Sequence, residues 1–361
     1  MWRKVHDCDV LVIGAGPAGS SAARAAAAAG ARVLIVDRKD SIGLPVQCAE
    51  HLPYRLAHDF GLLGGSDVVA QTVSAMHTHL PDGTSIETAA PGVICYRDRF
   101  DRLLLGLAEQ AGARFRGATA AVAFERGAVT LSGRDGMYTV TPAVIIGCDG
   151  PLSLVRRQLG LDRNQCVRAR QELLPLSRSL DATQIYFRHY MPGGYGWVFP
   201  KGGLANVGAG VDPRFGVRSG LALATLKQEL REAGVLDSGA SVSVTGGLIP
   251  VGGQSRVRAG NIILAGDAAG HSHPVTGAGV PSAVFAGEMA GTAAARTAAG
   301  EGDAALSDYE EQCELFIGAS WQDAVGRRQS IDRYWKSGVH ELSQAVKENW
   351  IAMKEHHETV N

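Results

Sequence analysis

The chain has 361 residues, of which 45% are hydrophobic and 20% are charged, a composition that indicates a globular protein of about two domains. The net charge of -1 gives no basic surface, so we expect no nucleic-acid partner. No apolar run approaches the roughly 18 residues of a membrane span, and residues 1–9 are too short and polar for a signal peptide. The six cysteines form no Cys-x-x-Cys pair. We therefore expect a cytoplasmic protein with reduced thiols and no metal site.

The first predicted elements are a strand, a glycine turn and a helix. Asp9 and the apolar residues 10–13 lead into Gly-Ala-Gly-Pro-Ala-Gly at 14–19, and small side chains predict a helix over 17–29. This pattern is typical of a dinucleotide site, where the glycines permit the turn, the approach of a pyrophosphate and the packing of the helix. A second strand, 32–36, ends at Asp37, at the spacing where an acidic side chain binds a ribose hydroxyl.

Loops, a hairpin and a helix are predicted next. Residues 41–65 are rich in glycine and proline and predict loops. Residues 72–95 alternate in polarity around Pro81-Asp82-Gly83 and predict a hairpin. Residues 98–111 carry apolar side chains at helical spacing. We expect further strands near 118–124, 127–132 and 143–148.

The second half of the chain predicts a sheet and then helices. Antiparallel strands are expected over 168–210, a helix over 218–234, strands at 241–249 and 261–265, and helices to about 299 and over 304–354. The predicted fold is α/β, a Rossmann-like nucleotide-binding domain with an inserted antiparallel β-sheet domain for substrate and a C-terminal helical segment. Its predicted boundaries are 1–70, 96–165 and 255–300 for the first domain, 71–95 and 166–254 for the second, and 301–361 for the segment.

Three further motifs accompany the first glycine motif. Residues 97–101 open the amphipathic helix, 147–156 follow the third strand, and Gly266-Asp267-Ala268-Ala269 follows the last. In this order and spacing, the four motifs resemble the flavoprotein hydroxylase and reductase superfamily that binds FAD in the manner of p-hydroxybenzoate hydroxylase. The resemblance covers most of residues 5–300 and implies tightly but not covalently bound FAD. It implies FAD contacts from Gly14, Gly16, Ala18, Gly19, Asp37, Arg38, Cys48, Arg97, Asp149, Gly266, Asp267, Gly277, Ala278 and Gly279.

Two of these positions and the electron donor have alternatives. Arg97 either meets the pyrophosphate or forms an ion pair with Asp101 one helical turn away. Asp149 either belongs to the FAD site or only forms a turn with Gly150. No second Gly-x-Gly-x-x-Gly motif occurs, so NAD(P)H docks without a dedicated domain or another electron donor serves.

A branch of the superfamily is indicated by residues 192–201, which contain Tyr-x-Trp-x-Phe-Pro. This segment resembles the signature of the geranylgeranyl reductase family, as do the loops 45–50 and 274–279, although Ala278 stands where many relatives carry Glu. The resemblance implies that reduced flavin transfers a hydride to a carbon–carbon double bond of an apolar, prenyl-bearing lipid. An acid must then supply a proton. The candidate catalytic residues are Cys48, Tyr195, Trp197 and His273.

Each candidate has a structural alternative. Cys48 is otherwise a small buried thiol, Tyr195 and Trp197 are otherwise core of the sheet, and His273 is otherwise a solvated loop residue. The aromatic side chains of 301–361 indicate either peripheral membrane contact or helices packed inward.

Two other functions remain open from the sequence. The first is a flavin-dependent monooxygenase that hydroxylates an aromatic substrate, including a tryptophan of a partner protein during quinone cofactor maturation. The polar sequence His271-Ser272-His273 favours it over a lipid substrate. The second is a non-catalytic flavin-binding assembly factor.

Overall fold

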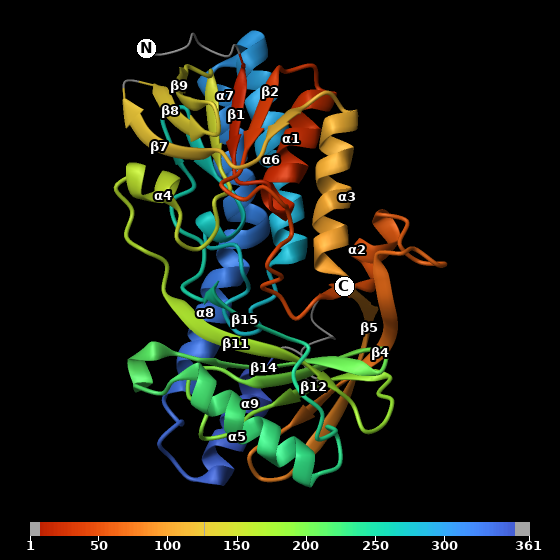
Figure 1. The fold of residues 1–361 in the computed structure, drawn as a ribbon. Coiled ribbons are helices and arrows are strands. Elements are labelled where there is room, and N and C mark those ends of the chain that lie inside the picture. The colour runs from red at the N-terminus through yellow and green to blue at the C-terminus, as the bar shows by residue number, and fades with distance from the viewer. Residues whose placement is uncertain (1–7, 126, 351–361) are drawn as a thin grey trace.

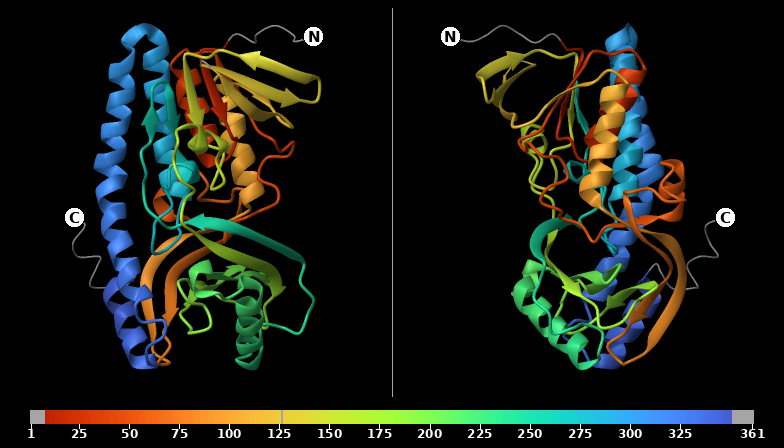
Figure 2. Two further views of the ribbon diagram at one scale, coloured as in Figure 1. Left: turned by 90° about the vertical axis from the view of Figure 1, so that its left-hand side faces the viewer. Right: turned by 45° about the vertical axis from the view of Figure 1, so that its right-hand side comes forward.

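The computed structural model describes residues 8–125 and 127–350, which form the predicted α/β fold (Figure 1). A six-stranded and an eight-stranded sheet lie at opposite ends of the molecule, and helices connect them (Figures 1 and 2). A separate three-stranded sheet packs beside the six-stranded one.

The six-stranded sheet holds the apolar runs that the sequence predicts as buried strands. Its strands are parallel except for the edge strand β16, which pairs antiparallel with β17. Helices and the small sheet cover its two faces, which explains why β1, β2 and β10 are buried at every position. The strand order is β16 (Arg258–Ala259), β17 (Ile262–Leu264), β10 (Val144–Gly147), β1 (Val10–Ile13), β2 (Val33–Val36) and β6 (Arg114–Arg116).

Two helices of small residues pack closely on this sheet. Helix α1 (Pro17–Ala28) and helix α6 (Val280–Arg296) run parallel, with Gly287 against Ala18 and Gly291 against Ala22. A Cβ atom on either glycine would overlap a carbonyl oxygen of α1, so only glycine allows this approach. Helix α3 (Arg97–Gln110) lies beside α1, and the opposite face is covered by β7 (Ala120–Glu125), β8 (Ala128–Gly133) and β9 (Gly136–Val140).

The eight-stranded sheet draws on segments that are far apart in the sequence. It departs from the prediction in two ways: β12 pairs parallel with β4, and β3, from the predicted loop region 41–65, adds an edge strand. All its other neighbouring pairs are antiparallel. The order is β15 (Ser243–Pro250), β11 (Cys166–Pro175), β14 (Leu204–Val211), β13 (Gly196–Lys201), β12 (Ala182–Tyr186), β4 (Val69–His79), β5 (Ser85–Cys95) and β3 (His51–Pro53).

The remaining helices cover the ends and the back of the molecule. Helix α5 (Ser219–Glu232) packs its apolar side on the eight-stranded sheet, and α2 (Tyr54–Asp59) and α4 (Leu154–Gln158) are short. A helical run through α7 (Asp303–Cys313) and α8 (Ala319–Asp332) extends from one large sheet to the other (Figure 2). Helix α9 (Val339–Asn349) follows. Residues 351–361 of the predicted C-terminal segment lie outside the described residues.

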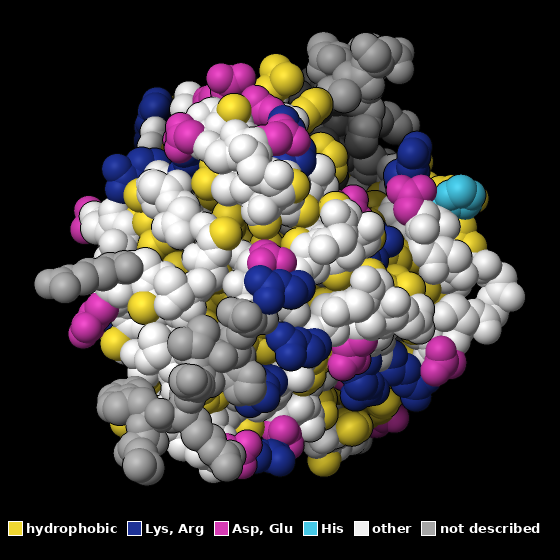
Figure 3. Space-filling view, turned by 90° about the horizontal axis from the view of Figure 1, so that it is seen from above, with side chains coloured by type: hydrophobic (Ala, Val, Ile, Leu, Met, Phe, Trp, Pro, Cys, Tyr) yellow, Lys and Arg dark blue, Asp and Glu magenta, His cyan; other side chains and the backbone are white. Residues whose placement is uncertain are grey.

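The aromatic residues of the C-terminal helices have two environments. Trp335 and Trp350 are buried in the core of the eight-stranded sheet, whereas Leu315 is 74% exposed and Phe316 is 55% exposed. No helix within residues 8–125 and 127–350 has the length and apolarity needed to cross a bilayer. On the face drawn in Figure 3, basic and acidic side chains are interspersed. All six cysteines carry free thiols.

Candidate active site

The glycine turn after β1 leaves its backbone open on one side. Gly14 has a φ of 103°, and a Cβ atom on Gly19 would lie 2.9 Å from the carbonyl carbon of Gly14 and 3.2 Å from Cβ of Cys148. Around Gly16, by contrast, no atom lies within 4 Å of a Cβ position, and no side chain caps the start of α1. Gly14 and Gly19 therefore serve packing, while the space around Gly16 leaves room for a phosphate at an uncapped helix N-terminus.

Asp37 ties the end of β2 to this turn. Its Oδ2 accepts a hydrogen bond from the backbone N–H of Ala15 at 2.8 Å, and its Oδ1 accepts one from Lys39 N at 2.8 Å. Each oxygen retains a lone pair for a ligand hydroxyl. Arg38, next to it, is exposed.

The last motif, residues 266–269, lies beside the first glycine motif, residues 14–19. A Cβ on Gly266 would come within 2.9 Å of Ala18 Cβ, at the start of α1. Oδ1 of the following Asp267 accepts a hydrogen bond from Ser272 Oγ at 2.7 Å, and a Cβ on Gly279 would lie 3.5 Å from that same Oδ1. Burial raises the pKa of Asp267, while the Ser272 hydrogen bond and the Arg97 charge oppose the rise. The start of α1 thus packs on Gly266, and the start of α6 lies against the carboxylate of the next residue, Asp267.

The carboxylate of Asp149 is already hydrogen-bonded by neighbouring groups of the protein. Its carboxylate accepts hydrogen bonds from Ser153 Oγ at 2.5 Å and from the backbone N–H groups of Leu154 at 2.6 Å and Val155 at 3.2 Å. These bonds satisfy the start of α4, so the geometry favours the structural alternative for Asp149. Arg156 then joins this motif to the last one, because its Nη1 donates to Ala268 O at 3.2 Å.

Arg97 forms the ion pair that the sequence left as an alternative. Its Nη2 and Nε lie 2.9 Å and 3.1 Å from Asp101 Oδ1, and both side chains are about nine-tenths buried. Nη1 donates to no acceptor among the described residues, so the guanidinium retains donors for a phosphate. The ion pair and the predicted pyrophosphate contact are therefore compatible.

Cys48 lies in a loop that polar side chains hold against the eight-stranded sheet. Its Sγ accepts a hydrogen bond from Glu50 N at 3.2 Å, and its carbonyl accepts one from Gln171 Nε2 at 2.9 Å. Gln171 also accepts the indole N–H of Trp197 at 2.8 Å. Cys48 and Trp197 are thus joined through one amide side chain, which the sequence analysis did not single out and which no motif marks.

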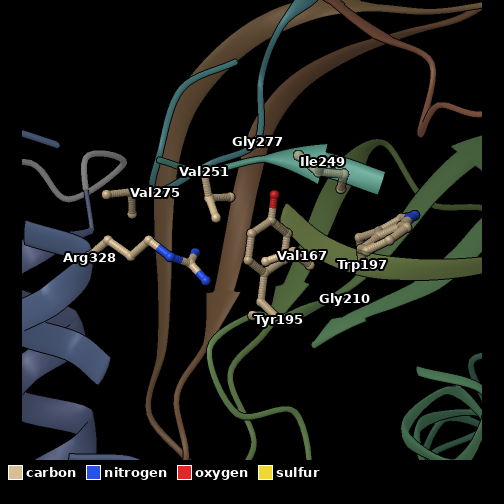
Figure 4. Close-up of a pocket in the computed structure, with 10 residues that line it drawn as sticks. Val167, Tyr195, Trp197, Gly210, Ile249, Val251, Val275, Gly277 and Arg328 are labelled. Carbon is tan, nitrogen blue, oxygen red and sulfur yellow. The ribbon is translucent and has the colours of Figure 1, made fainter. Parts of the chain in front are cut away.

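Tyr195 borders a small apolar cavity between β11, β13 and α8 (Figure 4). Its hydroxyl donates to the carbonyl of Thr276, and its ring centroid lies 6.1 Å from that of Trp197 and 5.4 Å from that of Trp350. The cavity holds about 20 Å³, room for roughly one water molecule. Tyr195 and Trp197 therefore pack in the core and also line a cavity, and their catalytic role stays a prediction.

Of the two loop histidines, His271 is buried and His273 is half-buried, and both are neutral. Burial lowers the pKa of His271 to about 3 and that of His273 to about 4. Nδ1 of His273 accepts hydrogen bonds from the backbone N–H groups of Val275 and Thr276, each at 3.2 Å, and its ring packs on Trp321. This geometry supports a structural role for His273, since an imidazolium acid is absent at neutral pH.

Several candidates gather where the two large sheets face each other. Electrostatic interactions link Cys48 with Tyr195 and with Arg97, and Arg97 with Asp267. The loop that ends in Gly277 reaches the same place, since a Cβ there would lie 3.8 Å from the Tyr195 hydroxyl. A flavin-type site and an apolar cavity are thus contiguous.

Comparison with known families agrees with this arrangement. A model of FAD-dependent oxidoreductases matches residues 9–43, and an FAD-binding domain model matches residues 63–184. The geranylgeranyl reductase catalytic domain matches residues 162–247, which include the Tyr195 and Trp197 strand.

Curated relatives match nearly the whole chain. Digeranylgeranylglycerophospholipid reductase 2 of Methanopyrus kandleri is 32% identical over 94% of this chain and 90% of its own. Digeranylgeranylglycerophospholipid reductase 1 of the same organism is 38% identical over 79% of this chain and 80% of its own. The chain belongs to the geranylgeranyl reductase family. It is an FAD-dependent oxidoreductase of the reductase type, as the sequence analysis predicts.

Solved structures show how widely the fold of this geranylgeranyl reductase family member is shared. A geranylgeranyl bacteriochlorophyll reductase-like protein from Thermoplasma acidophilum superposes with a TM-score of 0.85 at 24% identity, over 98% of this chain and 100% of that one. A p-nitrophenol 4-monooxygenase from Pseudomonas putida gives 0.74 at 16% identity, over 99% of this chain and 97% of that one. At these identities the likeness concerns the fold alone.

The residues of this family member fit FAD. The open backbone at Gly16, the uncapped start of α1 and the carboxylates of Asp37 and Asp267 provide the donors and acceptors that a dinucleotide requires. Nη1 of Arg97 adds a cationic donor at the junction of the two sheets.

Proposed function

We propose that this protein reduces isolated carbon–carbon double bonds in the prenyl chains of a lipid. The observation that carries the proposal is the apolar cavity beside Tyr195, contiguous with the flavin-type site, in a chain whose relatives are named digeranylgeranylglycerophospholipid reductases. Bound FAD supplies the hydride for the double bond. The proposed substrate domain, 71–95 and 166–254, supplies the cavity wall.

The cavity side chains exclude water from the reacting double bond. An isolated alkene is a poor hydride acceptor, so water must be kept away and the proton donor must be well placed. Tyr195, Trp197 and Val275 line the cavity, and the buried Tyr195 hydroxyl donates to the Thr276 carbonyl. Burial raises the pKa of Tyr195, which keeps the phenol neutral.

A prenyl chain needs more room than this cavity offers. Binding sites for molecules of that size usually enclose roughly 300 Å³ or more, against about 20 Å³ here. Some wall residues therefore move when the chain enters. Trp350 does not line the cavity, but we propose that it moves and lets Tyr195 shift, because its ring contacts Tyr195 while its indole N–H is buried without a partner among the described residues.

We propose Cys48 as the proton donor. It lies in the loop that contacts Trp197 through Gln171, it is only partly buried, and its sulfur is held by the Glu50 N–H. His273 is not retained for this role, because burial lowers its pKa to about 4 and two backbone N–H groups occupy its Nδ1.

We also propose that the protein contacts a membrane surface, since its substrate is a lipid. Phe285 of α6 and Phe316 pack edge to face with centroids 5.5 Å apart, yet they are 43% and 55% exposed, and Leu315 beside them is 74% exposed. Exposed aromatic and aliphatic side chains of this kind insert at a lipid interface.

The test is an anaerobic reoxidation experiment. The FAD-loaded protein is reduced with dithionite, the excess is removed, a geranylgeranyl lipid is added without oxygen, and the flavin absorbance is followed. We expect the oxidised spectrum to return and the lipid to gain two hydrogens per reduced bond, whereas the fully saturated lipid leaves the flavin reduced. A flavin that stays reduced until air enters would refute the proposal and favour the monooxygenase. NAD(P)H can replace dithionite to identify the donor.

A further inference from the structure

Glu50 has a backbone conformation that an amino acid with a side chain rarely adopts. Its φ is 73°, and Ala118 is the only other non-glycine residue of the described chain with a positive φ. The left-handed region is unfavourable for an L-residue, whereas glycine adopts it readily. Such outliers persist where the surrounding structure holds them and occur often at functional sites. The contacts of the Glu50 side chain therefore need an explanation.

The carboxylate of Glu50 is bound from three separate elements. The side chain is 2% exposed, and its Oε1 accepts a hydrogen bond from Arg97 N, at the start of α3, at 2.9 Å. Its Oε2 accepts one from Asn206 Nδ2 of β14 at 2.7 Å and forms an ion pair with Lys201 Nζ of β13. Lys201, itself 11% exposed, also lies over the ring of Tyr96 at 4.4 Å. The buried carboxylate is thus paired with a cation and hydrogen-bonded at both oxygens.

The backbone of the same residue faces Cys48. In this left-handed conformation the Glu50 N–H donates to Cys48 Sγ at 3.2 Å, while the Glu50 carbonyl accepts from Cys95 N at 2.8 Å. Asn206 adds a second bond to the loop, from its Nδ2 to Ala49 O at 3.2 Å. The Glu50 carboxylate therefore fixes the loop to three other elements, while the Glu50 backbone N–H holds the Cys48 thiol.

We infer that Glu50 is a positioning residue that holds the sulfur of Cys48 at the junction of the two sheets. This inference rests on the proposed role of Cys48 and extends it. A glycine at position 50 would relieve the backbone strain, yet it would remove the side-chain contacts to α3 and β13 and one of the two hydrogen bonds to β14. Lys201 follows the Tyr-x-Trp-x-Phe-Pro signature directly, so the ion pair also fixes the cysteine loop relative to the cavity wall.

The first experiment compares Glu50→Gly with Glu50→Ala. Both remove the anchor, but only glycine removes the strain, so E50G should melt roughly 2 °C higher than E50A. Both should nevertheless lose turnover per bound flavin about 100-fold, the effect expected when a catalytic group is misplaced by about 1 Å. The loss should lie in kcat, with KM for the lipid unchanged. Ala118→Gly is the matched control, since it relieves the same kind of strain and should keep full turnover. An E50G variant with normal turnover would overturn the inference.

A double-mutant cycle separates positioning from general damage. If Glu50 acts through Cys48, adding E50G to Cys48→Ala should reduce turnover no further. An additive loss would show that Glu50 acts elsewhere.

A labelling experiment works without any substrate. In E50G the loop loses its carboxylate anchor, so N-ethylmaleimide should label Cys48 at least tenfold faster than in the wild-type protein, with Cys166 unchanged as the internal reference. Equal Cys48 labelling would overturn the inference. If the labelling differs in this way but the wild-type protein reduces no lipid, the proposed function alone is refuted.

Discussion

Substituting alanine at two glycines of the first motif should separate cofactor binding from packing. In Gly16→Ala the new methyl group meets no protein atom within 4 Å, and the φ of -74° and ψ of -173° suit alanine. In Gly19→Ala it would meet the Gly14 backbone and Cys148 Cβ, the latter at 3.2 Å. The two variants differ by one methyl each and sit three residues apart, so each is the control for the other.

The expected magnitudes follow from these surroundings. Without FAD, G16A should be as stable as the wild-type protein, whereas G19A should lose roughly 1–3 kcal/mol of unfolding free energy through overpacking. With FAD, the methyl group that G16A introduces fills the space through which a phosphate reaches the start of α1. A hydrogen bond to a charged group contributes roughly 1.5–3 kcal/mol. Losing one should weaken FAD binding roughly 10- to 100-fold.

Thermal melting of the FAD-free proteins and quenching of flavin fluorescence measure the two effects. If G16A binds FAD with wild-type affinity, the opening at Gly16 is not where the pyrophosphate lies. If FAD-free G19A melts at the same temperature as the wild-type protein, the packing argument for Gly19 is wrong.

Three further predictions concern the flavin carboxylate, the buried histidines and the exposed phenylalanines. Asp267→Ala should be purified with less than a tenth of the wild-type flavin absorbance per protein, and full absorbance would remove Asp267 from the site. Because burial lowers the pKa of His271 to about 3 and of His273 to about 4, the unfolded chain binds protons first. Stability should therefore fall as pH drops from about 6.5 to 4, and His273→Asn, which keeps an acceptor but cannot titrate, should flatten this fall in denaturant titrations. A double substitution of Phe285 and Phe316 by Ser should reduce sedimentation with phosphatidylcholine vesicles at least threefold, and unchanged sedimentation would contradict membrane contact there.

Local sequence patterns were sufficient to predict the central strands and the first glycine motif of the nucleotide-binding half. The strands β1, β2 and β10 are short apolar runs buried on both sides, and such runs between glycine turns are legible without tertiary information. The first glycine motif is also local, because its strand, turn and helix are contiguous. The family assignment followed from motifs of this kind.

Contacts between distant segments were not predictable from the sequence. Trp350 reaches Tyr195 from a helix 155 positions later, and β12 pairs parallel with β4 across more than a hundred residues. The burial of His273 depends on Trp321 in α8, so its neutral state is a tertiary property. Glu50 gave no local signal either, since the left-handed backbone there is held by α3, β13 and β14.

The uncapped starts of the parallel helices α1 and α6 make the stability of the folded protein depend on the supply of riboflavin. Gly287 and Gly291 hold α1 and α6 side by side and parallel, so the positive ends of both helices point the same way, with no side-chain cap at either start. An anionic ligand at these uncapped starts binds the folded protein and not the unfolded chain, so the FAD-bound protein is the more stable form by mass action. In a cell short of riboflavin, more of the newly made chains remain without cofactor and are exposed to proteases. The steady-state amount of this protein should then follow the flavin supply even when its messenger RNA does not change.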